Sequence, residues 1–276
     1  MSKKSVISLI SYDASYLPAS IKSYYHYVDE IILGLDSERI TWSGNTFKFN
    51  EAALWRELKA IDKDNKISII EDNFHQSDIA IENDNYERNF LKKECSHDWI
   101  FSFDADEQLL NAKDFFYNYC PIVDRYKKKV DLCMTWATPY KIIDDTVLVI
   151  ANEDNSAFFG EVQGFATSSD STFTYARWTE KSASGHNRVK SPLVSIHWSL
   201  CRSKEALYEK IHNIGHSDIV ENDPFYEKWN EVTLENYEEL RNFKTSGLGE
   251  AQWPKLFALP LEQLESYYKQ QIARCY

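Results

Sequence analysis

The chain has 276 residues, of which 43% are hydrophobic and 14% aromatic. This length and composition suit one large α/β domain with a sizeable core, and they exclude a disordered chain. The formal net charge of −12 argues against nucleic-acid binding, because phosphate contacts need clustered Lys and Arg.

Strands and helices alternate along the first half of the chain. Apolar runs predict strands over 5–11, 29–36, 66–72 and 98–104. The segments between them predict helices over 16–28, 49–62 and 83–96, with Pro18 in the first turn of the first helix. Strands joined by helices form a mainly parallel sheet, which binds ligands beyond the carboxyl ends of its strands.

The second half of the chain is less regular. Within residues 112–126 it predicts a helix that ends at Pro121. It also predicts strands over 130–136, 146–151 and 192–198, and strand pieces with loops over 152–192. Ser203 is an N-cap residue for a helix over 204–215, and residues 224–273 are expected to be mostly helix.

No apolar run reaches the roughly 20 residues of a transmembrane helix, and MSKKSVISLIS is too polar downstream for a secretion signal. The five cysteines are scattered without CxxC spacing, so we expect reduced thiols and neither disulfides nor a zinc cluster. We therefore expect a cytoplasmic protein, peripheral at most to the inner membrane.

The stretch DWIFSFDADEQLL, residues 98–110, runs a predicted strand directly into three acids. Residues two apart in an extended chain point to the same side, so Asp104 and Asp106 can face one ligand. A hard cation such as Mg²⁺ or Mn²⁺ relieves the repulsion between two carboxylates and usually binds substrate phosphates as well. The motif predicts a cation site for a diphosphate ligand; the alternative is a polar turn capped by Asp.

Candidate partners for this motif lie near residue 200. His197 ends a predicted strand, and its imidazole is either a metal ligand or a hydrogen-bonded polar residue. Arg202 and Lys204 lie near a helix start, where phosphate is favoured, or they are ordinary surface charges. Trp136 and Tyr140 are candidates for stacking on a sugar or for the core.

Three segments together resemble one family. They are ISLISYDASYLPASIKSYYHYVDEIILGLD, YERNFLKKECSHDWIFSFDADEQL and SIHWSLCRSKEALYEKIHNIGHS. The first two are similar to the nucleotide-binding half of glycosyltransferases with the GT-A fold, family 2 in particular, and the third is similar to a segment near the end of many such transferases. The resemblance covers residues 5–110 and 193–217. It implies a Rossmann-like GT-A domain over 1–200, which binds the nucleotide sugar and is catalytic, and a helical extension packed on it over 201–276.

The resemblance also implies residue roles. The nucleotide-sugar donor would be bound by Tyr12, Asp13, Asp36, Arg88, Asp104 and Arg202. Mn²⁺ or Mg²⁺ would be held by Asp106, Asp104 and His197.

The implied activity is metal-dependent transfer of a hexosyl group from a UDP- or GDP-linked sugar to a hydroxyl of a glycan or polysaccharide intermediate, with inversion. The usual ED pair is absent, so the base is sought among Glu180, Asp170 and Glu161, in that order. Two alternatives stay open: a non-catalytic module that binds nucleotide sugar or carbohydrate, and a sugar nucleotidyltransferase.

Overall fold

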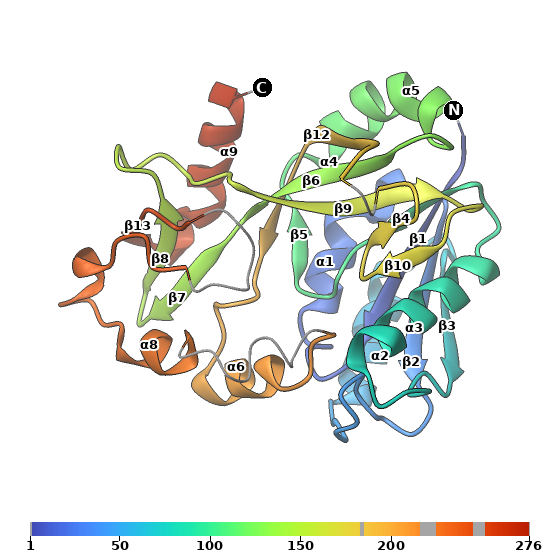
Figure 1. Cartoon of the computed structure of the whole chain (residues 1–276), viewed down its shortest axis with the longest axis horizontal. Coiled ribbons are helices and arrows are strands. Elements are labelled where there is room, and N and C mark those ends of the chain that lie inside the picture. The colour runs from blue at the N-terminus through green and yellow to red at the C-terminus, as the bar shows by residue number, and fades with distance from the viewer. Residues whose placement is uncertain (1, 183–184, 216–224, 245–251, 276) are drawn as a thin grey trace.

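The computed structural model describes residues 2–182, 185–215, 225–244 and 252–275. Its centre is an eight-stranded sheet with the order β3-β2-β1-β4-β9-β6-β12-β5 (Figure 1). The strands are β1 Lys4–Ile10, β2 Glu30–Asp36, β3 Ile67–Asp72, β4 Trp99–Ser102, β5 Glu107–Leu109, β6 Asp131–Ala137, β9 Glu161–Ser168 and β12 Arg188–His197. All except β9 and β5 run in one direction. The expected α/β class with a mainly parallel sheet is therefore confirmed.

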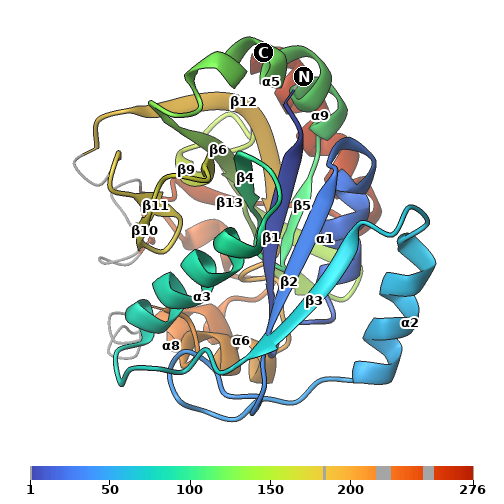
Figure 2. The same ribbon diagram turned by 90° about the vertical axis from the view of Figure 1, so that its right-hand side faces the viewer.

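Helices cover both faces of this sheet (Figure 2). Those of the first half are α1 Leu17–Tyr24, α2 Glu51–Ile61 and α3 Ala80–Glu94, close to the predicted segments. Pro18 lies in the first turn of α1, where its missing N–H costs no helical bond.

Alternation along the strands divides the core between the two faces. In β1, Val6 and Ile10 pack in a cluster with residues of α1 and α2, whereas Ile7 packs on the other face with Leu91 of α3. The helix α3 crosses β2 so closely that a Cβ on Gly34 would lie 2.5 Å from a carboxylate oxygen of Glu87. This close approach places the charged residues of α3 against the sheet.

The segment over 112–126 is helical throughout, although its geometry changes along the way. It consists of α4 Ala112–Asp114, a π-helical segment Phe115–Tyr119, α5 Cys120–Val123 and a 3₁₀ turn Asp124–Tyr126. The expected end at Pro121 is wrong, because Pro121 lies in the first turn of α5, where proline is tolerated.

A second, three-stranded sheet has the order β13-β8-β7. Its strands are β7 Pro139–Ile143, β8 Thr146–Ala151 and β13 Lys255–Pro260. The strand β13 lies within the segment expected to be mostly helix, of which α8 Phe225–Glu231 and α9 Leu264–Cys275 are helical and residues 245–251 lie outside the described residues. Leu256 and Leu259 of β13 pack in different core clusters. The apolar pattern of this six-residue strand is too short to distinguish a strand from a helix in the sequence. The boundary at residue 200 stays a prediction.

The helix α6 Lys204–Ile211 begins as predicted, because the Ser203 hydroxyl accepts from the N–H of Ala206. Within the described ranges, no helix is long and apolar enough to cross a membrane. Cys95, Cys120, Cys133 and Cys201 are free thiols.

Candidate functional site

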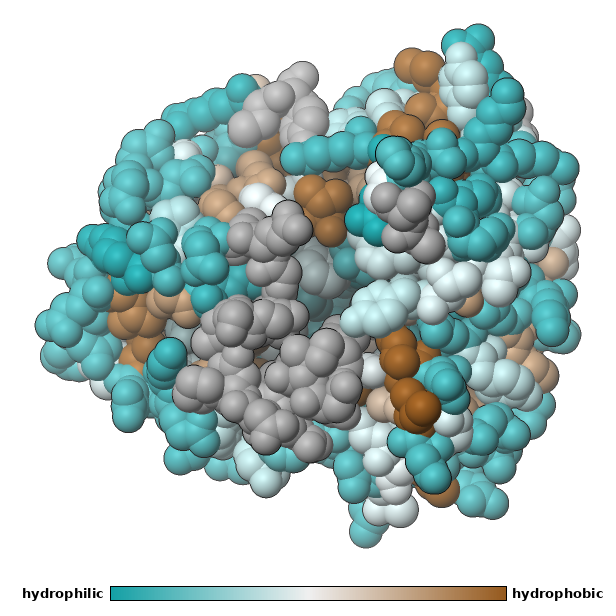
Figure 3. All heavy atoms as spheres, in the orientation of Figure 1, coloured by the Kyte–Doolittle hydropathy of each residue, from teal (hydrophilic) through white to brown (hydrophobic). Residues whose placement is uncertain are grey.

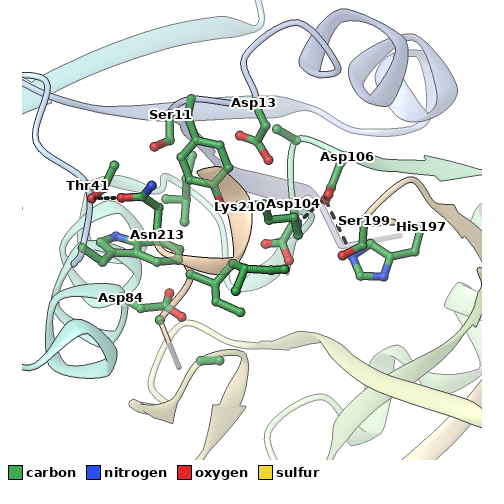
Figure 4. A pocket seen from close by; sticks show the side chains of 18 of the residues that line it. Ser11, Asp13, Thr41, Asp84, Asp104, Asp106, His197, Ser199, Lys210 and Asn213 are labelled. Atoms are coloured by element: carbon green, nitrogen blue, oxygen red, sulfur yellow. Dashed lines mark hydrogen bonds and ion pairs between the residues drawn. The ribbon is translucent and has the colours of Figure 1, made fainter. Parts of the chain in front are cut away.

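A cavity of about 500 Å³ lies at the carboxyl edge of the central sheet (Figure 4). Residues 11–13, Asp36 and residues 104–106, which end or follow β1, β2 and β4, line it. The strand order reverses direction between the neighbours β1 and β4, because β2 and β3 lie on one side of this pair and β9 lies on the other. Ligands of open α/β sheets bind at such a switch point, in cavities of roughly this size.

Asp106 lies at the centre of a buried ion-pair network. Its Oδ2 atom accepts from Arg202 Nη2 at 2.5 Å and from Lys210 Nζ at 2.8 Å. Its Oδ1 atom lies 3.7 Å from His197 Nε2. Burial by itself would raise the pKa of Asp106, but Lys210, His197 and Arg202 outweigh burial and hold the pKa well below its ordinary value. Asp106 is therefore ionised at neutral pH.

Asp104 faces two guanidinium groups. Arg88 Nη2 of α3 donates to Asp104 Oδ1 at 3.0 Å, and Arg177 Nη2 lies 3.6 Å from Oδ2. Burial opposes ionisation, but Arg177 and Arg88 prevail and lower the pKa of Asp104 from 3.8 to about 2. Arg88 is itself fixed by Asp84 at 2.5 Å and by the Ser102 hydroxyl at 2.7 Å.

Glu107, the third acid of the motif, is fully buried and binds Arg177 through both oxygens, at 2.7 and 2.8 Å. It also accepts from Trp136 Nε1 at 2.6 Å. The Trp136 ring stacks on the imidazole of His197, with ring centroids 3.9 Å apart. Burial raises the pKa of Glu107, and Arg177 opposes that rise. Glu107 thus orients the groups around the cavity and does not face a ligand.

Two donor atoms here fit a divalent cation: Asp106 Oδ1 and His197 Nε2. Burial lowers the pKa of His197 from 6.5 to about 4, although Asp106 opposes this, so the imidazole is neutral at pH 7 and its nitrogen can bind a metal. Mg²⁺ and Mn²⁺ sites often use one or two protein ligands and complete their shell with water and phosphate. Asp104 fits less well, because both of its oxygens face Arg88 or Arg177. Over the described part of the chain, no three His, Cys, Asp or Glu side chains group as a complete metal site.

The end of the cavity near β2 and α3 combines hydrogen-bonding groups with an indole. Thr41 Oγ1 donates to Asn213 Oδ1 at 2.7 Å, which joins the loop after β2 to the segment after α6 (Figure 4). Trp42 Nε1 donates to Glu87 Oε2 at 2.7 Å. Burial raises the pKa of Glu87 from 4.5 to about 8, against the opposing effects of Trp42 and Arg88. Glu87 is therefore mostly protonated at pH 7.

Asp36 lines the same end but is engaged with the backbone. Its Oδ1 atom accepts from the N–H groups of Glu38 and Ile40, and its Oδ2 atom accepts from the N–H of Phe74. These bonds fix the loops after β2 and β3 and leave Asp36 less able to accept from a ligand.

Tyr12 and Asp13 follow β1 and line the cavity. Asp13 Oδ2 accepts from Arg202 Nη2 at 3.3 Å, so Arg202 bridges Asp13 and Asp106. Burial raises the pKa of Asp13, and Arg202 opposes the rise. Arg202 therefore belongs to the ion-pair network and is not a surface charge.

The opposite end of the cavity contains Glu161, at the start of β9. Its Oε1 atom accepts from Lys244 Nζ at 2.6 Å and from Trp253 Nε1 at 3.1 Å, and its Oε2 atom accepts from Thr138 Oγ1 at 2.9 Å. Because β9 runs against β4, its first residue lies at the same edge of the sheet as the DAD motif.

The other two candidate bases lie elsewhere. Glu180 is exposed, does not line the cavity and accepts from the N–H of Thr172 at 2.5 Å. Asp170 does not line it either; its side chain is 58% exposed and lies 4.0 Å from Lys128. Of the three candidates, only Glu161 shares the cavity with Asp104, Asp106 and His197.

Three basic residues of the site were not anticipated from the sequence: Arg177, Lys210 and Lys244. Lys210 lies in α6, two turns after the N-cap residue Ser203, and Arg202 lies directly before that cap, so the predicted helix could have indicated it. Arg177 reaches the site from the hairpin of β10 Phe173–Tyr175 and β11 Trp178–Thr179, and no local pattern predicts this. Lys244 comes from the segment before β13 and likewise has no local signal.

The fold and the site define an α/β protein with a charged ligand cavity at the switch point of its sheet. No family model matches the chain, and no curated protein matches it.

Solved structures match at low similarity. The S. aureus TarS 1-349 structure in complex with UDP is 11% identical over 51% of this chain and 37% of that chain, with a TM-score of 0.33. The S. aureus TarS structure is 13% identical over 85% and 46%, with a TM-score of 0.41. HddC from Yersinia pseudotuberculosis is 10% identical over 79% and 100%, with a TM-score of 0.36. These values carry no argument about function.

Proposed function

We propose that the chain is a glycosyltransferase that moves a sugar from a nucleotide diphosphate sugar to a hydroxyl of an acceptor. One observation carries the proposal: the same cavity joins an indole-lined polar end, a charged centre at Asp106 and an acid at Glu161. A nucleoside, a diphosphate and a transferred sugar require these three environments in this order.

The nucleoside would bind at the end formed by Trp42, Thr41 and Asn213. An indole face suits stacking on a base. Asn213 lines this end, and its side-chain amide can donate a hydrogen bond that a base carbonyl can accept. UDP- or GDP-linked donors both present such a carbonyl, and we propose a donor of this group.

The diphosphate would lie beside Asp106. Five acids of the network face only four basic side chains, so the network has no excess positive charge to compensate the negative charge of a diphosphate. The acids are Asp13, Asp84, Asp104, Asp106 and Glu107, and the basic residues are Arg88, Arg177, Arg202 and Lys210. This charge balance supports metal dependence, with Asp106 Oδ1 and His197 Nε2 as the protein ligands.

A bound Mn²⁺ or Mg²⁺ would supply the positive charge that stabilises the departing nucleoside diphosphate. Lys210 and Arg202 hold Asp106 in place, and the Trp136 ring fixes the plane of His197. These contacts preorganise the site before the donor arrives, so little reorganisation accompanies transfer.

We propose Glu161 as the general base, in preference to Glu180 and Asp170. It is the candidate that lines the cavity, and three donors fix its carboxylate. Removal of the acceptor hydroxyl proton on the side opposite the leaving group would give inversion at the anomeric carbon. We further propose a hexosyl donor of the family 2 type and a glycan or polysaccharide intermediate as acceptor.

The test is a thermal-shift and turnover screen of UDP-, GDP- and CMP-linked sugars, with and without Mn²⁺. We expect one nucleotide class to raise the unfolding temperature more in Mn²⁺ than without it, and release of its diphosphate in the presence of acceptor. Binding without release in any acceptor would indicate a binding module. No shift with any donor would contradict the proposal.

A further inference from the structure

An exposed surface around α5 combines apolar side chains with positive charge. Tyr117, Ile122 and Tyr126 are 53%, 61% and 45% exposed and lie on consecutive turns of the helical run over 112–126. Buried residues of the same run, such as Phe115 and Phe116, pack against the sheet and fix its orientation. Figure 3 shows hydrophobic residues next to hydrophilic ones at the upper edge, where α5 lies in Figure 1.

The charge of this surface is opposite to that of the whole chain. Residues 2–3 and 112–129 contain six basic and two acidic residues, whereas the chain carries a net charge of −12. The Ser2 hydroxyl donates to Asp124 Oδ2 at 2.8 Å, which places Lys3 beside the 112–129 segment. The basic residues are Lys3, Lys113, Arg125, Lys127, Lys128 and Lys129, and the acidic ones are Asp114 and Asp124.

Most of these basic groups reach solvent. Lys3, Lys113, Arg125 and Lys129 are exposed, and the Lys128 side chain is 66% exposed and lies 4.0 Å from Asp170. The Arg125 guanidinium lies 4.8 Å from the centre of the Tyr126 ring, so charge and aromatic surface are presented together. Basic residues around exposed Tyr and Ile are the arrangement that binds the interface of an anionic membrane.

We propose that this surface, called the α5 surface and made of Tyr117, Ile122 and Tyr126 with the six basic residues, docks on an anionic lipid bilayer. A second copy of the chain is a poorer partner through the same surface, because a two-fold contact would oppose two basic patches. The acidic remainder of the chain is repelled by the bilayer and so turns the α5 surface toward it.

Docking at this surface leaves the cavity open. The α5 surface adjoins the start of β1 through Ser2, and the cavity adjoins its end, so the two are separated by the length of a seven-residue strand, about 23 Å. We therefore expect a variant to lose lipid binding and keep glycosyl transfer, or to lose transfer and keep lipid binding, so the two proposals can be tested separately.

The test is co-sedimentation of the full chain with vesicles of phosphatidylcholine alone and of phosphatidylcholine mixed with phosphatidylglycerol. We expect binding only to the anionic vesicles, weakened by salt. Lys128→Glu/Lys129→Glu should weaken binding at least about 25-fold, from about fivefold per lysine removed. Ile122→Ser/Tyr117→Ser should weaken it through the apolar contact, with an unchanged unfolding temperature as the check of folding.

The matched control is Arg56→Glu/Lys59→Glu, an equal charge change on the exposed face of α2. It should bind as the unchanged chain does. Absence of binding to anionic vesicles, or equal losses in the control and the α5 variants, would overturn the proposal. A change of oligomeric state in the α5 variants without a change in lipid binding would overturn it in favour of a protein interface.

Discussion

Arg177→Met tests whether the charge network is arranged as described. The Arg177 side chain is almost fully buried and forms two hydrogen bonds to Glu107, which is also fully buried. The substitution removes the positive charge and keeps most of the volume. Glu107 must then either stay ionised without a partner, at a cost of about 3–5 kcal/mol, or take up a proton.

Protonation is the less costly response. Neutralising a group with an ordinary pKa of 4.5 costs about 1.36 kcal/mol per pH unit above that value, which is about 3.4 kcal/mol at pH 7 and about 0.7 kcal/mol at pH 5. In the variant, the folded-state pKa of Glu107 lies above the unfolded value, so the folded state binds more protons. The stability of the variant therefore falls as pH rises from the unfolded pKa toward the folded one.

Urea unfolding of both proteins at pH 5 and pH 7 measures this difference. We expect Arg177→Met to lose about 3.4 kcal/mol at pH 7 and about 0.7 kcal/mol at pH 5. The control Arg177→Met/Glu107→Gln should show a smaller pH dependence, because Glu107 no longer titrates and Asp104 is the remaining carboxylate that faces Arg177. Equal losses at both pH values in the single variant would refute the charge pairing of Glu107 and Arg177.

Three further predictions concern the cavity. Trp136→Leu removes the ring stacked on His197 and should weaken Mn²⁺-dependent donor binding about tenfold in calorimetry, with metal-free nucleotide binding unchanged; an equal loss in both would mean a general distortion. Lys244→Met removes one of the donors that fix the Glu161 carboxylate, so kcat should fall about tenfold with donor binding unchanged, and Lys244→Arg should restore it; an unchanged kcat would argue against Glu161 as the base. Since the folded pKa of His197 is about 4, its NMR titration should be flat from pH 8 to pH 5. The unfolded state binds this proton more readily, so His197 lowers the stability of the fold increasingly as pH falls from 6.5 through 4. A titration midpoint near 6.5 would contradict its burial beside Trp136.

The sequence was informative where local patterns decide the structure. The alternation of apolar strands and helices predicts the order of elements from β1 to β4, and the strand-end rule predicts that Asp104, Asp106 and Tyr12 meet at one edge. The pairing of Asp106 with His197 across the sheet was anticipated only through the family resemblance. Its geometry follows from β12 lying antiparallel to β5, with His197 opposite Glu107.

The sequence was uninformative where a contact depends on distant segments. Arg177 and Lys244 lie in irregular stretches, and only the folded hairpin and the segment before β13 bring them to Glu107 and Glu161. For the same reason, the three candidate acids could not be ranked by spacing. Glu161 is the first residue of β9, which runs antiparallel to its neighbours β4 and β6. The start of β9 therefore lies at the edge where β4 and β6 end, and Glu161 lines the cavity there.

Calorimetric titration of a nucleotide sugar into the unchanged chain and into Asp106→Asn, each with and without Mn²⁺, tests the central claim most directly. We expect saturable binding to one site in the unchanged chain, strengthened by Mn²⁺, and loss of that strengthening in Asp106→Asn. The loss follows because the variant keeps the cavity but removes one of the two metal-binding atoms. Equal Mn²⁺-dependent binding by both proteins, or no binding of any nucleotide sugar by either, would contradict the account.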